Sequence, residues 1–388
     1  MTIDKKSSII YVIAIIIVAI NLRAGITCVG PILSLINEDL HLSYTQMGFL
    51  TTLPLIAFAT VSILVTQLYR KLGLEKVIIL GIILIALGTY GRTLSGWTLL
   101  LICTFAMGSG IAICNVALIP FIKKHFKNNY AEVTGAYTLF MSVFAALGSG
   151  FSAPLALEYG MGWRGSMAFW SYFTIIAIVF WIYIWTRGIS KRPEAMPTDY
   201  SIWKSNKAWH ITIFMGLQSL LFYSFAAWGP EILQTKGFSI SESGWAIFYL
   251  QIISLPAVFL VPVWAKNKKY LPTIVWAMSF GYLIAFTSMF FNEKYIIYFG
   301  LTIMGWAMGG SISFAYFLIN TKTKKPETTI RLSAMTQSFG YLLAAVGPFI
   351  VGWVFDLVQN WNFIIVGFLV FSIAYFYFSV RSSQLEAI

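Results

Sequence analysis

Long runs of apolar residues alternate with short polar segments along the whole chain of 388 residues. About 20 apolar residues are enough to cross a hydrocarbon core of about 30 Å. Backbone polar groups in lipid must be hydrogen-bonded internally, and the runs lack the alternation typical of barrel strands, so each is predicted to be a helix. The twelve predicted spans cover residues 9–36, 46–68, 76–95, 97–121, 131–157, 165–187, 208–229, 243–264, 271–291, 295–320, 329–357 and 361–381.

Composition supports an all-α integral membrane protein. Hydrophobic residues make up 59% of the chain and charged residues 10%, whereas about a quarter of the residues in soluble proteins are charged. The net charge of +12 is spread over small clusters between the spans, which argues against a nucleic-acid-binding face. The three cysteines lie inside apolar segments and are interpreted as core residues. We expect neither a metal site nor a cofactor.

The basic residues predict how the chain crosses the membrane. Twenty-one of the 26 Lys and Arg residues fall before the first span, after an even-numbered span or after the last. Positive charge marks cytoplasmic segments, so both termini are predicted to lie in the cytoplasm. The protein is predicted to be located in the cytoplasmic membrane. Four basic residues, Arg92, Arg164, Lys236 and Lys294, are assigned to the opposite side, and Arg23 remains inside a span.

The sequence also contains an internal repeat. "VGPILSLINEDL" begins at Val29 and "WGPEILQTKGF" begins at Trp228, and further pairs such as "FAMGSG" (105–110) and "WAMGGS" (306–311) are also about 200 residues apart. We therefore predict two pseudo-symmetric halves of six helices, residues 1–187 and 208–388, joined by a cytoplasmic loop, 188–207. Parallel repeats with a substrate site between them are typical of secondary transporters.

With these features the chain resembles the major facilitator superfamily over essentially its full length. The segment "TQLYRKLGLEK" (66–76) stands where that superfamily has the motif G-x-L-x-D-R-x-G-R-[RK]. Leu68 and Gly73 match the motif, but Thr66 and Arg70 replace its first Gly and its Asp. The resemblance therefore does not imply, for this chain, the Asp-based latch that the loop forms in the superfamily. "GPFIVGWVFD" (347–356) matches a common superfamily pattern in helix 11.

A narrower resemblance rests on "NLRAGITCVGPIL" (21–33), "LYRKLGLEK" (68–76) and "GWRGSMAFW" (162–170). These segments are similar to the cyanate permease and 2-nitroimidazole transporter family, whose first helix reads N-L-R-P-x-x-T-x-V-G-P. Ala24 stands where that pattern has Pro, so we expect a softer kink in helix 1. The resemblance implies transport of cyanate-like anions, nitroimidazoles or other small organic molecules.

Arg23 is the strongest candidate for contact with a solute. It lies about 14 residues beyond Ile9, or roughly 21 Å along a helix, where an Arg costs about 2.5–3.5 kcal/mol. No carboxylate lies near the middle of any span, so an anion or a carbonyl-rich solute would suit its planar fork of donors. In a continuous helix Thr27, Gly30 and Ser34 would extend one polar stripe from Arg23. The alternative is an Arg that caps carbonyl groups of a broken helix.

Further candidates are polar or aromatic residues on helices that line the cavity in the superfamily. Plain helix packing is the alternative for each of them. Asn21 is offset from the Arg23 face and is expected either to contact solute or to bridge to a neighbouring helix. The repeat places Phe222 opposite Arg23. The candidate substrate-binding residues besides Arg23 are Asn21, Thr27, Asn115, Tyr137, Met141, Gln218, Phe222, Tyr316, Gln337 and Tyr341.

Small residues at helical spacing are interpreted as packing or conformational positions, because they let helices approach closely. Glu132, at the cytoplasmic start of helix 5, is the candidate for proton coupling, with a solvated surface charge as its alternative. The packing or conformational residues are Gly30, Pro31, Gly73, Gly108, Gly229, Pro230, Gly309, Gly347 and Pro348.

These features predict a secondary transporter that moves a small anionic or polar solute by alternating access. We expect a monomer in the lipid bilayer, with a small-molecule substrate and no nucleic-acid partner. Multidrug efflux by antiport is the alternative within transport, and a membrane sensor that binds solute without moving it is the alternative from another class. The spans contain no constellation typical of an intramembrane enzyme.

Overall fold

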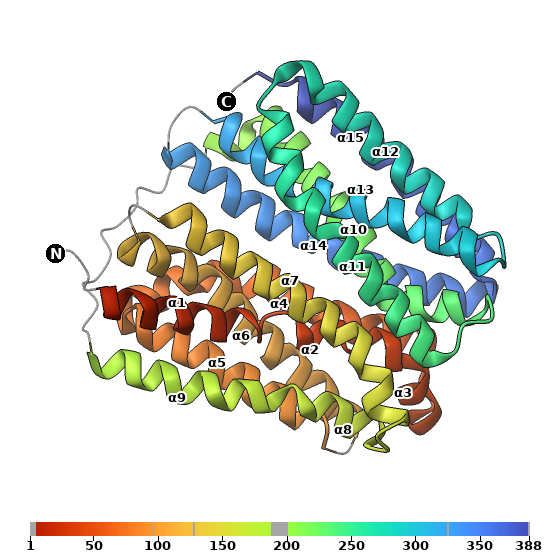
Figure 1. Cartoon of the computed structure of the whole chain (residues 1–388), viewed down its shortest axis with the longest axis horizontal. Helices are drawn as coiled ribbons and strands as arrows, with labels where there is room; N and C mark the ends of the chain where they lie inside the picture. The colour runs from red at the N-terminus through yellow and green to blue at the C-terminus, as the bar shows by residue number, and fades with distance from the viewer. Residues whose placement is uncertain (1–4, 95, 127–128, 188–200, 324–325, 387–388) are drawn as a thin grey trace. The chain divides into compact units, whose positions relative to one another are not determined.

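The computed structural model describes residues 5–386 apart from residues 95, 127–128, 188–200 and 324–325 (Figure 1). The described part of the chain is helical and contains no strand. Twelve segments in it are long and apolar enough to cross a membrane, from Ile9–Leu40 to Trp361–Gln384. The predicted all-α membrane architecture and the count of twelve spans are therefore confirmed.

The chain forms two compact units. The N-terminal unit consists of Met1–Leu40 and Ile56–Met196, and the C-terminal unit consists of His41–Leu55 and Pro197–Ile388. Helix α4 (Tyr44–Leu72) therefore begins in the C-terminal unit and ends in the N-terminal unit. The predicted halves placed all of this helix in the first half. Most of the predicted central loop, residues 188–200, lies outside the described residues, as do the side chains of Thr66 and Arg70.

In the N-terminal unit, α5 packs against α6 and α9, and α7 packs against α1, α2 and α8. The broken first span supplies four short elements instead of one helix (Figure 1). The elements of this unit besides α4 are α1 (Lys5–Ala19), α2 (Ala24–Thr27), η1 (Gly30–Ile32), α3 (Leu33–Leu40), α5 (Leu74–Gly91), α6 (Trp97–His125), α7 (Tyr130–Leu157), α8 (Gly162–Phe169) and α9 (Ser171–Arg187).

In the C-terminal unit, α10 packs along α14, α11 along α13, and α12 against both α13 and α15. Helix α10 is the most enclosed, with 83% of its most apolar window buried, against 33% for α15. The elements of this unit are η2 (Ser201–Lys204), α10 (Asn206–Gln234), α11 (Ile240–Ala265), η3 (Lys268–Tyr270), α12 (Leu271–Ser288), α13 (Lys294–Thr321), α14 (Pro326–Val358) and α15 (Trp361–Gln384).

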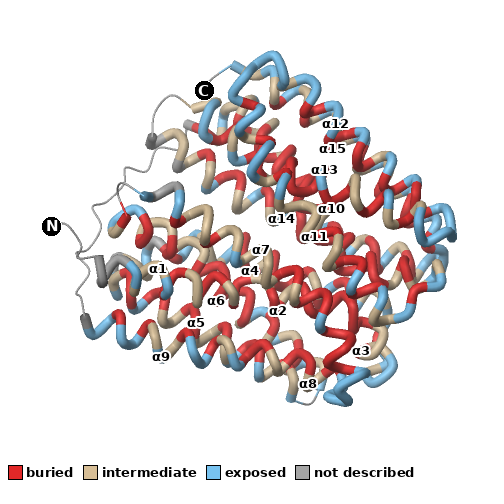
Figure 2. The backbone as a smooth tube through the Cα atoms, in the orientation of Figure 1, coloured by how far each residue is buried: buried red, intermediate tan, exposed pale blue. Residues whose placement is uncertain are grey.

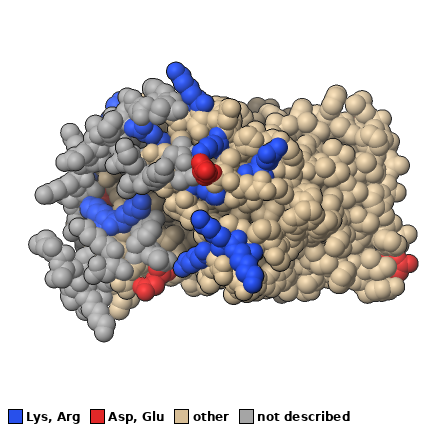
Figure 3. All heavy atoms as spheres, turned by 90° about the horizontal axis from the view of Figure 1, so that it is seen from above, with Lys and Arg blue, Asp and Glu red and all other residues tan. Residues whose placement is uncertain are grey.

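Large apolar side chains are exposed along the outer helices. Figure 2 shows many exposed residues on α12 and α15, and Trp276, Val370 and Ile373 are among them. Contiguous apolar surface of this kind is unusual on a soluble protein. It is the surface that a bilayer covers. On the face shown in Figure 3, Lys and Arg side chains gather toward one end, and uncharged residues cover most of the rest.

Candidate functional site

The first membrane span is broken at the segment that carries Arg23. Helix α1 ends at Ala19, and α2 begins at Ala24. Arg23 has φ −130° and ψ −37°, which is outside the helical region. A second interruption at Cys28 and Val29 separates α2 from η1. Our expectation of a softer kink is wrong, because the helix breaks here without a Pro at position 24.

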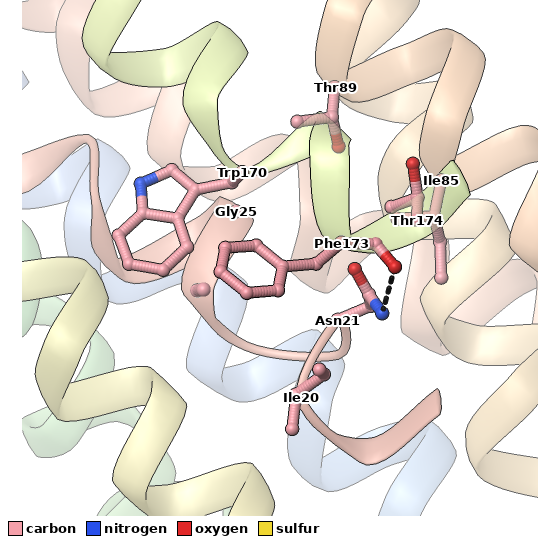
Figure 4. Close-up of a pocket in the computed structure, with 9 residues that line it drawn as sticks. Ile20, Asn21, Gly25, Ile85, Thr89, Trp170, Phe173 and Thr174 are labelled. Atoms are coloured by element: carbon pink, nitrogen blue, oxygen red, sulfur yellow. Dashed lines mark hydrogen bonds between the residues drawn. The ribbon is translucent and has the colours of Figure 1, made fainter. Parts of the chain in front are cut away.

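The side chain of Asn21 accounts for the break. In a continuous helix the backbone N–H of Asn21 would donate to the carbonyl of Ile17. Instead the Asn21 amide Nδ2 donates to that carbonyl, 2.7 Å away, and the backbone N–H turns to Val18, 2.9 Å away. An Asn side chain competes with helical hydrogen bonds in this way. Nδ2 also lies 3.3 Å from the carbonyl oxygen of Phe173 in α9 (Figure 4), so Asn21 bridges to a neighbouring helix, as one of its two interpretations expected.

The short helix α2 is held against α7 by hydrogen bonds and by close backbone approach. Thr27 Oγ1 donates to the carbonyl of Ala145 at 2.7 Å, and Ser149 Oγ donates to the carbonyl of Thr27 at 3.3 Å. A Cβ on Gly148 would lie 2.6 Å from Thr27 Oγ1 and 2.9 Å from the carbonyl oxygen of Ala24, so this position has no room for a larger residue. Thr27 is buried in this contact. Its role as a solute ligand remains a prediction.

A small cavity lies beside the break (Figure 4). It has a volume of about 10 Å³, which is room for about one water molecule. Asn21 and Gly25 form one side, Ile85 and Thr89 of α5 another, and Trp170 and Phe173 the third. The cavity is too small for an organic solute.

Arg92 is a buried cation that the sequence reasoning missed. It was assigned to the non-cytoplasmic side of the membrane without an expectation of burial, and it is 0% exposed. The residue caps the C-terminus of α5, and its Nη2 donates to the sulfur of Cys28 at 3.3 Å. Nε and Nη1 have no hydrogen-bond partner among the described residues. Gly25 of α2 lies beside Nη2, and a Cβ there would come 2.9 Å from the sulfur of Met107.

The surroundings of Arg92 compensate its charge poorly. The effective penalty for burying an ion is several kcal/mol, whereas a helix C-terminus stabilises a cation by about 0.3–1 kcal/mol and at most about 2 kcal/mol. A thiol is a weak acceptor, and a guanidinium cannot lose its proton in a protein. None of the four ion pairs seen among the described residues includes Arg92. The sequence signal that could have revealed it is the pair Gly88 and Gly91, where Cβ atoms would collide with α6.

Two other candidates meet in the N-terminal unit. The hydroxyl of Tyr137 in α7 donates to Oδ1 of Asn115 in α6 at 2.7 Å. Tyr137 is 6% exposed, and Asn115 is half-buried. Met141, one turn further along α7, is half-buried as well. Arg23 is also half-buried, so its guanidinium is not sealed from solvent in the way that Arg92 is.

The candidates in the C-terminal unit are spread over three helices. Gln218 is buried in α10, and its Nε2 donates to the hydroxyl of Ser219. Phe222 and Tyr341 both contact Tyr223, with ring centroids 5.0 Å and 6.3 Å apart. Gln337 donates to Ser333 within α14, and Tyr316 is exposed on α13. The structure thus brings Phe222 and Tyr341 to one aromatic cluster, and their contact with solute remains a prediction.

Several of the predicted packing residues lie where backbones come close. A Cβ on Gly309 would collide with the carbonyl oxygen of Ser254 in α11, and one on Gly347 with the hydroxyl of Ser224 in α10. The carbonyl of Pro348 accepts a hydrogen bond of 2.9 Å from Trp228 Nε1. The remaining members of the set lie in η1 (Gly30, Pro31), α6 (Gly108), α10 (Gly229, Pro230) and the turn before α5 (Gly73, φ +84°).

Glu132, the candidate for proton coupling, is exposed in the first turn of α7. A carboxylate near a helix N-terminus is stabilised by the helix dipole. Its position is compatible with the alternative, a solvated surface charge, and its role in coupling stays a prediction.

In the described part of the chain, twelve membrane-length segments in two units, with a broken first span, form the architecture that is typical of multi-pass secondary transporters. The sequence matches the Major Facilitator Superfamily over residues 15–348, and the chain belongs to this superfamily. It is therefore a transporter and not an enzyme.

Three bacterial relatives align over most of their length. The chain is 39% identical to the uncharacterized transporter YycB of Bacillus subtilis, over 93% of this chain and 90% of the relative. It is 32% identical to the 2-nitroimidazole transporter of Escherichia coli, over 96% and 95%, and 20% identical to the cyanate transport protein CynX of the same species, over 88% of both chains. These relatives confirm the resemblance that "NLRAGITCVGPIL" indicated.

The fold is similar to that of solved transporters. A bacterial homologue of the human lysosomal transporter Spinster superposes with a TM-score of 0.79 at 14% identity, over 98% of this chain and 97% of the other. At that identity the likeness concerns the fold.

Proposed function

We propose that the protein carries a small anionic or strongly polar solute across the cytoplasmic membrane by alternating access, with Arg23 as the residue that binds the solute. Cyanate-like anions and nitroimidazoles are the proposed substrate classes, because two relatives are named as transporters of these compounds.

The observation that carries the proposal is the break of the first span at Arg23. A discontinuous helix offers backbone groups and a side chain to a solute at a depth where the rest of the helix is apolar. Arg23 itself has a non-helical conformation and is half-buried. A guanidinium at such a place binds carboxylate-like or linear anions through two parallel hydrogen bonds.

The proposal also states that both termini lie in the cytoplasm. The distribution of Lys and Arg between the spans supports this orientation. Reporter fusions at the C-terminus and after Gly160 test it. Activity of a cytoplasmic reporter at the C-terminus, and its loss at Gly160, are expected, and the reverse pattern would refute this orientation.

Uptake into proteoliposomes tests the transport function. Wild-type protein should take up radiolabelled cyanate or a 2-nitroimidazole above the level of empty vesicles, and Arg23→Ala should lose at least 90% of that uptake. Arg23→Lys keeps the charge without the fork and should be intermediate. Arg381→Ala, at a residue exposed on α15, is the matched control. Unchanged uptake and binding in Arg23→Ala would show that the solute site lies elsewhere.

An imposed pH gradient in the same vesicles tests coupling. Accelerated uptake with an acidic exterior would indicate proton symport, and its loss in Glu132→Gln would assign the coupling to that carboxyl. If Glu132→Gln keeps the acceleration, Glu132 is a surface charge.

A further inference from the structure

We propose that a hollow between the start of α12 and the end of α15 binds the phosphate head group of an anionic phospholipid. The hollow lies within the C-terminal unit, so it is distinct from the solute site proposed at Arg23 in the N-terminal unit. Lys268 would contact the phosphate, and the apolar part of the lipid would lie along Trp276.

The hollow is large enough for a head group. Helices α12 and α15 pack along each other (Figure 1), and the space between their adjoining ends has a volume of about 180 Å³. The cavity beside Asn21 has a volume of only about 10 Å³, and roughly 10–15 Å³ is enough for one water molecule. The hollow therefore accommodates a group of several non-hydrogen atoms, such as a phosphate with its ester oxygens.

The lining of the hollow is polar at one end and apolar at the other. Lys268, Ser383 and Gln384 line it where α12 begins and α15 ends. Val275 and Trp276 line it about one turn further along α12, which is roughly 6–8 Å at about 1.5 Å per residue. This order, from charged to apolar within about one helical turn, matches the order of phosphate, glycerol and acyl chain in a phospholipid.

Positive charge gathers at the polar end of the hollow. Lys268 and Lys269 are consecutive and exposed, and none of the four ion pairs seen among the described residues includes either of them. Glu386, which follows α15, pairs instead with Lys207 at 4.0 Å. Basic side chains at a membrane surface attract anionic lipids. The described side chains therefore leave Lys268 available to an external anion.

A second lysine brings like charge close to Lys268. Nζ of Lys322, at the end of α13, donates hydrogen bonds to the carbonyl oxygens of Ser383 and Leu385. Burial lowers the pKa of Lys322, and the charge of Lys268 lowers it further. The two ammonium groups thus repel each other beside the end of α15, and an anion bound at Lys268 would offset this repulsion.

The apolar end of the hollow adjoins the exposed side of α12 (Figure 2). Trp276 is 48% exposed, and its ring centroid lies 4.8 Å from that of Phe376 in α15 and 5.4 Å from that of Phe280. Trp rings are typical of the boundary between head groups and hydrocarbon. An acyl chain attached to the bound phosphate would continue along these rings, whereas a free inorganic anion would gain nothing from them. The observations therefore favour a phospholipid.

Lipid binding to the full-length purified protein in detergent is the test. Dioleoyl phosphatidylglycerol, which is anionic, would be titrated while thermal unfolding is followed, with zwitterionic dioleoyl phosphatidylcholine as the control. A saturable rise in Tm of about 3–5 °C is expected when phosphatidylglycerol exceeds its Kd by about 100-fold. No saturable rise with phosphatidylglycerol, or an equal rise with phosphatidylcholine, would overturn the inference.

Two lysine variants separate a built site from general attraction by surface charge. Lys268→Gln should weaken phosphatidylglycerol binding at least about tenfold, because it removes a charge-assisted hydrogen bond to the phosphate. Lys269→Gln removes the same charge one residue away, from a side chain that does not line the hollow, and it should weaken binding by no more than about threefold. If the two variants weaken binding equally, or if neither does, the site is refuted.

A change of shape tests the hollow without changing its charge. Val380 lines the hollow from α15, so the indole ring of Val380→Trp should fill the space and abolish the rise in Tm. Val370→Trp is the matched control, because Val370 is 60% exposed on the same helix and does not line the hollow. This control should retain the rise. A full rise in Val380→Trp would place the lipid elsewhere on the protein.

Inorganic phosphate distinguishes a lipid from a free anion. Sodium phosphate, added in place of sodium gluconate at constant ionic strength, should give no saturable rise in Tm. A rise as large as that with phosphatidylglycerol, lost in Lys268→Gln, would show that the hollow takes a free anion and would contradict the lipid assignment. Arg23→Ala should keep the response to phosphatidylglycerol even if it loses transport, so the two proposals fail separately.

Discussion

The hydroxyl of Tyr137 donates a hydrogen bond of 2.7 Å to the amide oxygen of Asn115, and this contact joins the N-terminal third of α7 to α6. The two residues are 22 positions apart in sequence. Because Oδ1 of Asn115 accepts this bond, the Nδ2 group of Asn115 is the part of the amide that can donate to a solute. An amide that is oriented in this way is suited to the acceptor oxygen or nitrogen of a small polar solute.

Removing the hydroxyl should therefore affect transport. Tyr137→Phe keeps the ring but frees Asn115 to rotate, and a typical hydrogen bond contributes about 0.5–1.5 kcal/mol. We expect a KM for uptake that is roughly 2–12-fold higher, with little change in the amount of folded protein. Tyr375→Phe removes a similar buried bond, to Ser311 in the C-terminal unit, and it should leave KM unchanged. Equal effects of both variants would indicate a general loss of stability.

The break in the first span should depend on Asn21. Asn21→Leu removes the amide that donates hydrogen bonds to the carbonyls of Ile17 and Phe173. The carbonyl of Ile17 is then available to the backbone N–H of residue 21, so α1 is expected to continue toward Arg23. Uptake should fall at least tenfold while the protein still folds, because Leu favours both helix and lipid. Asn21→Gln, which keeps the donor on a longer arm, should retain more uptake. Wild-type uptake in Asn21→Leu would show that the break does not need this side chain.

Asp356 should stabilise the start of α4. Its carboxylate accepts hydrogen bonds from the backbone N–H groups of Tyr44, at 3.0 Å, and Thr45, at 2.7 Å. Loss of such a cap costs about 0.5–2 kcal/mol, so Asp356→Ala should lower Tm by several degrees, and Asp356→Asn by less. Glu293→Ala is the control, since Glu293 precedes α13 without a side-chain cap bond. A Tm equal to that of the wild type in Asp356→Ala would contradict the capping role.

Gly309 should tolerate no side chain. A methyl group there would collide with the backbone oxygen of Ser254 in α11, and overpacking of this kind costs about 1–3 kcal/mol. Gly309→Ala is expected to reduce Tm and the yield of folded protein. Gly367→Ala in α15 is the matched control, because its Cβ would meet no atom within 4 Å, and it should leave Tm unchanged or raise it slightly. If the two variants have the same Tm and yield, α11 and α13 do not pack closely enough at Gly309 to exclude a methyl group.

The twelve spans could be predicted because their signal is local. A membrane helix needs only length and apolarity, since its backbone hydrogen bonds are internal to each span. The predicted span 9–36 corresponds to Ile9–Leu40 and the predicted span 165–187 to Gly162–Thr186. Arg23 stood out for the same reason, as a charge inside an apolar run. The helix break beside it appeared only in the alternative interpretation of Arg23, because a local pattern does not decide whether the Asn21 amide takes the place of the backbone donor to Ile17. The second contact of Asn21, to Phe173, joins residues 152 positions apart and could not be predicted from the local sequence.

The sequence by itself determined the membrane class, the number of spans and the resemblance to a transporter family, all of which depend on hydropathy and short motifs. Only the tertiary structure decided which polar groups meet. Asn115 and Tyr137 form a pair because α6 and α7 lie side by side, and Thr27 is buried because α2 packs on α7. Arg92 shows the difference most clearly. Its position at the end of a span indicates a surface charge, but Gly88 and Gly91 let α6 pack closely against this end of α5, and the side chain of Arg92 is fully buried. The two glycines are visible in the sequence, but only the packing of the helices shows what they bury.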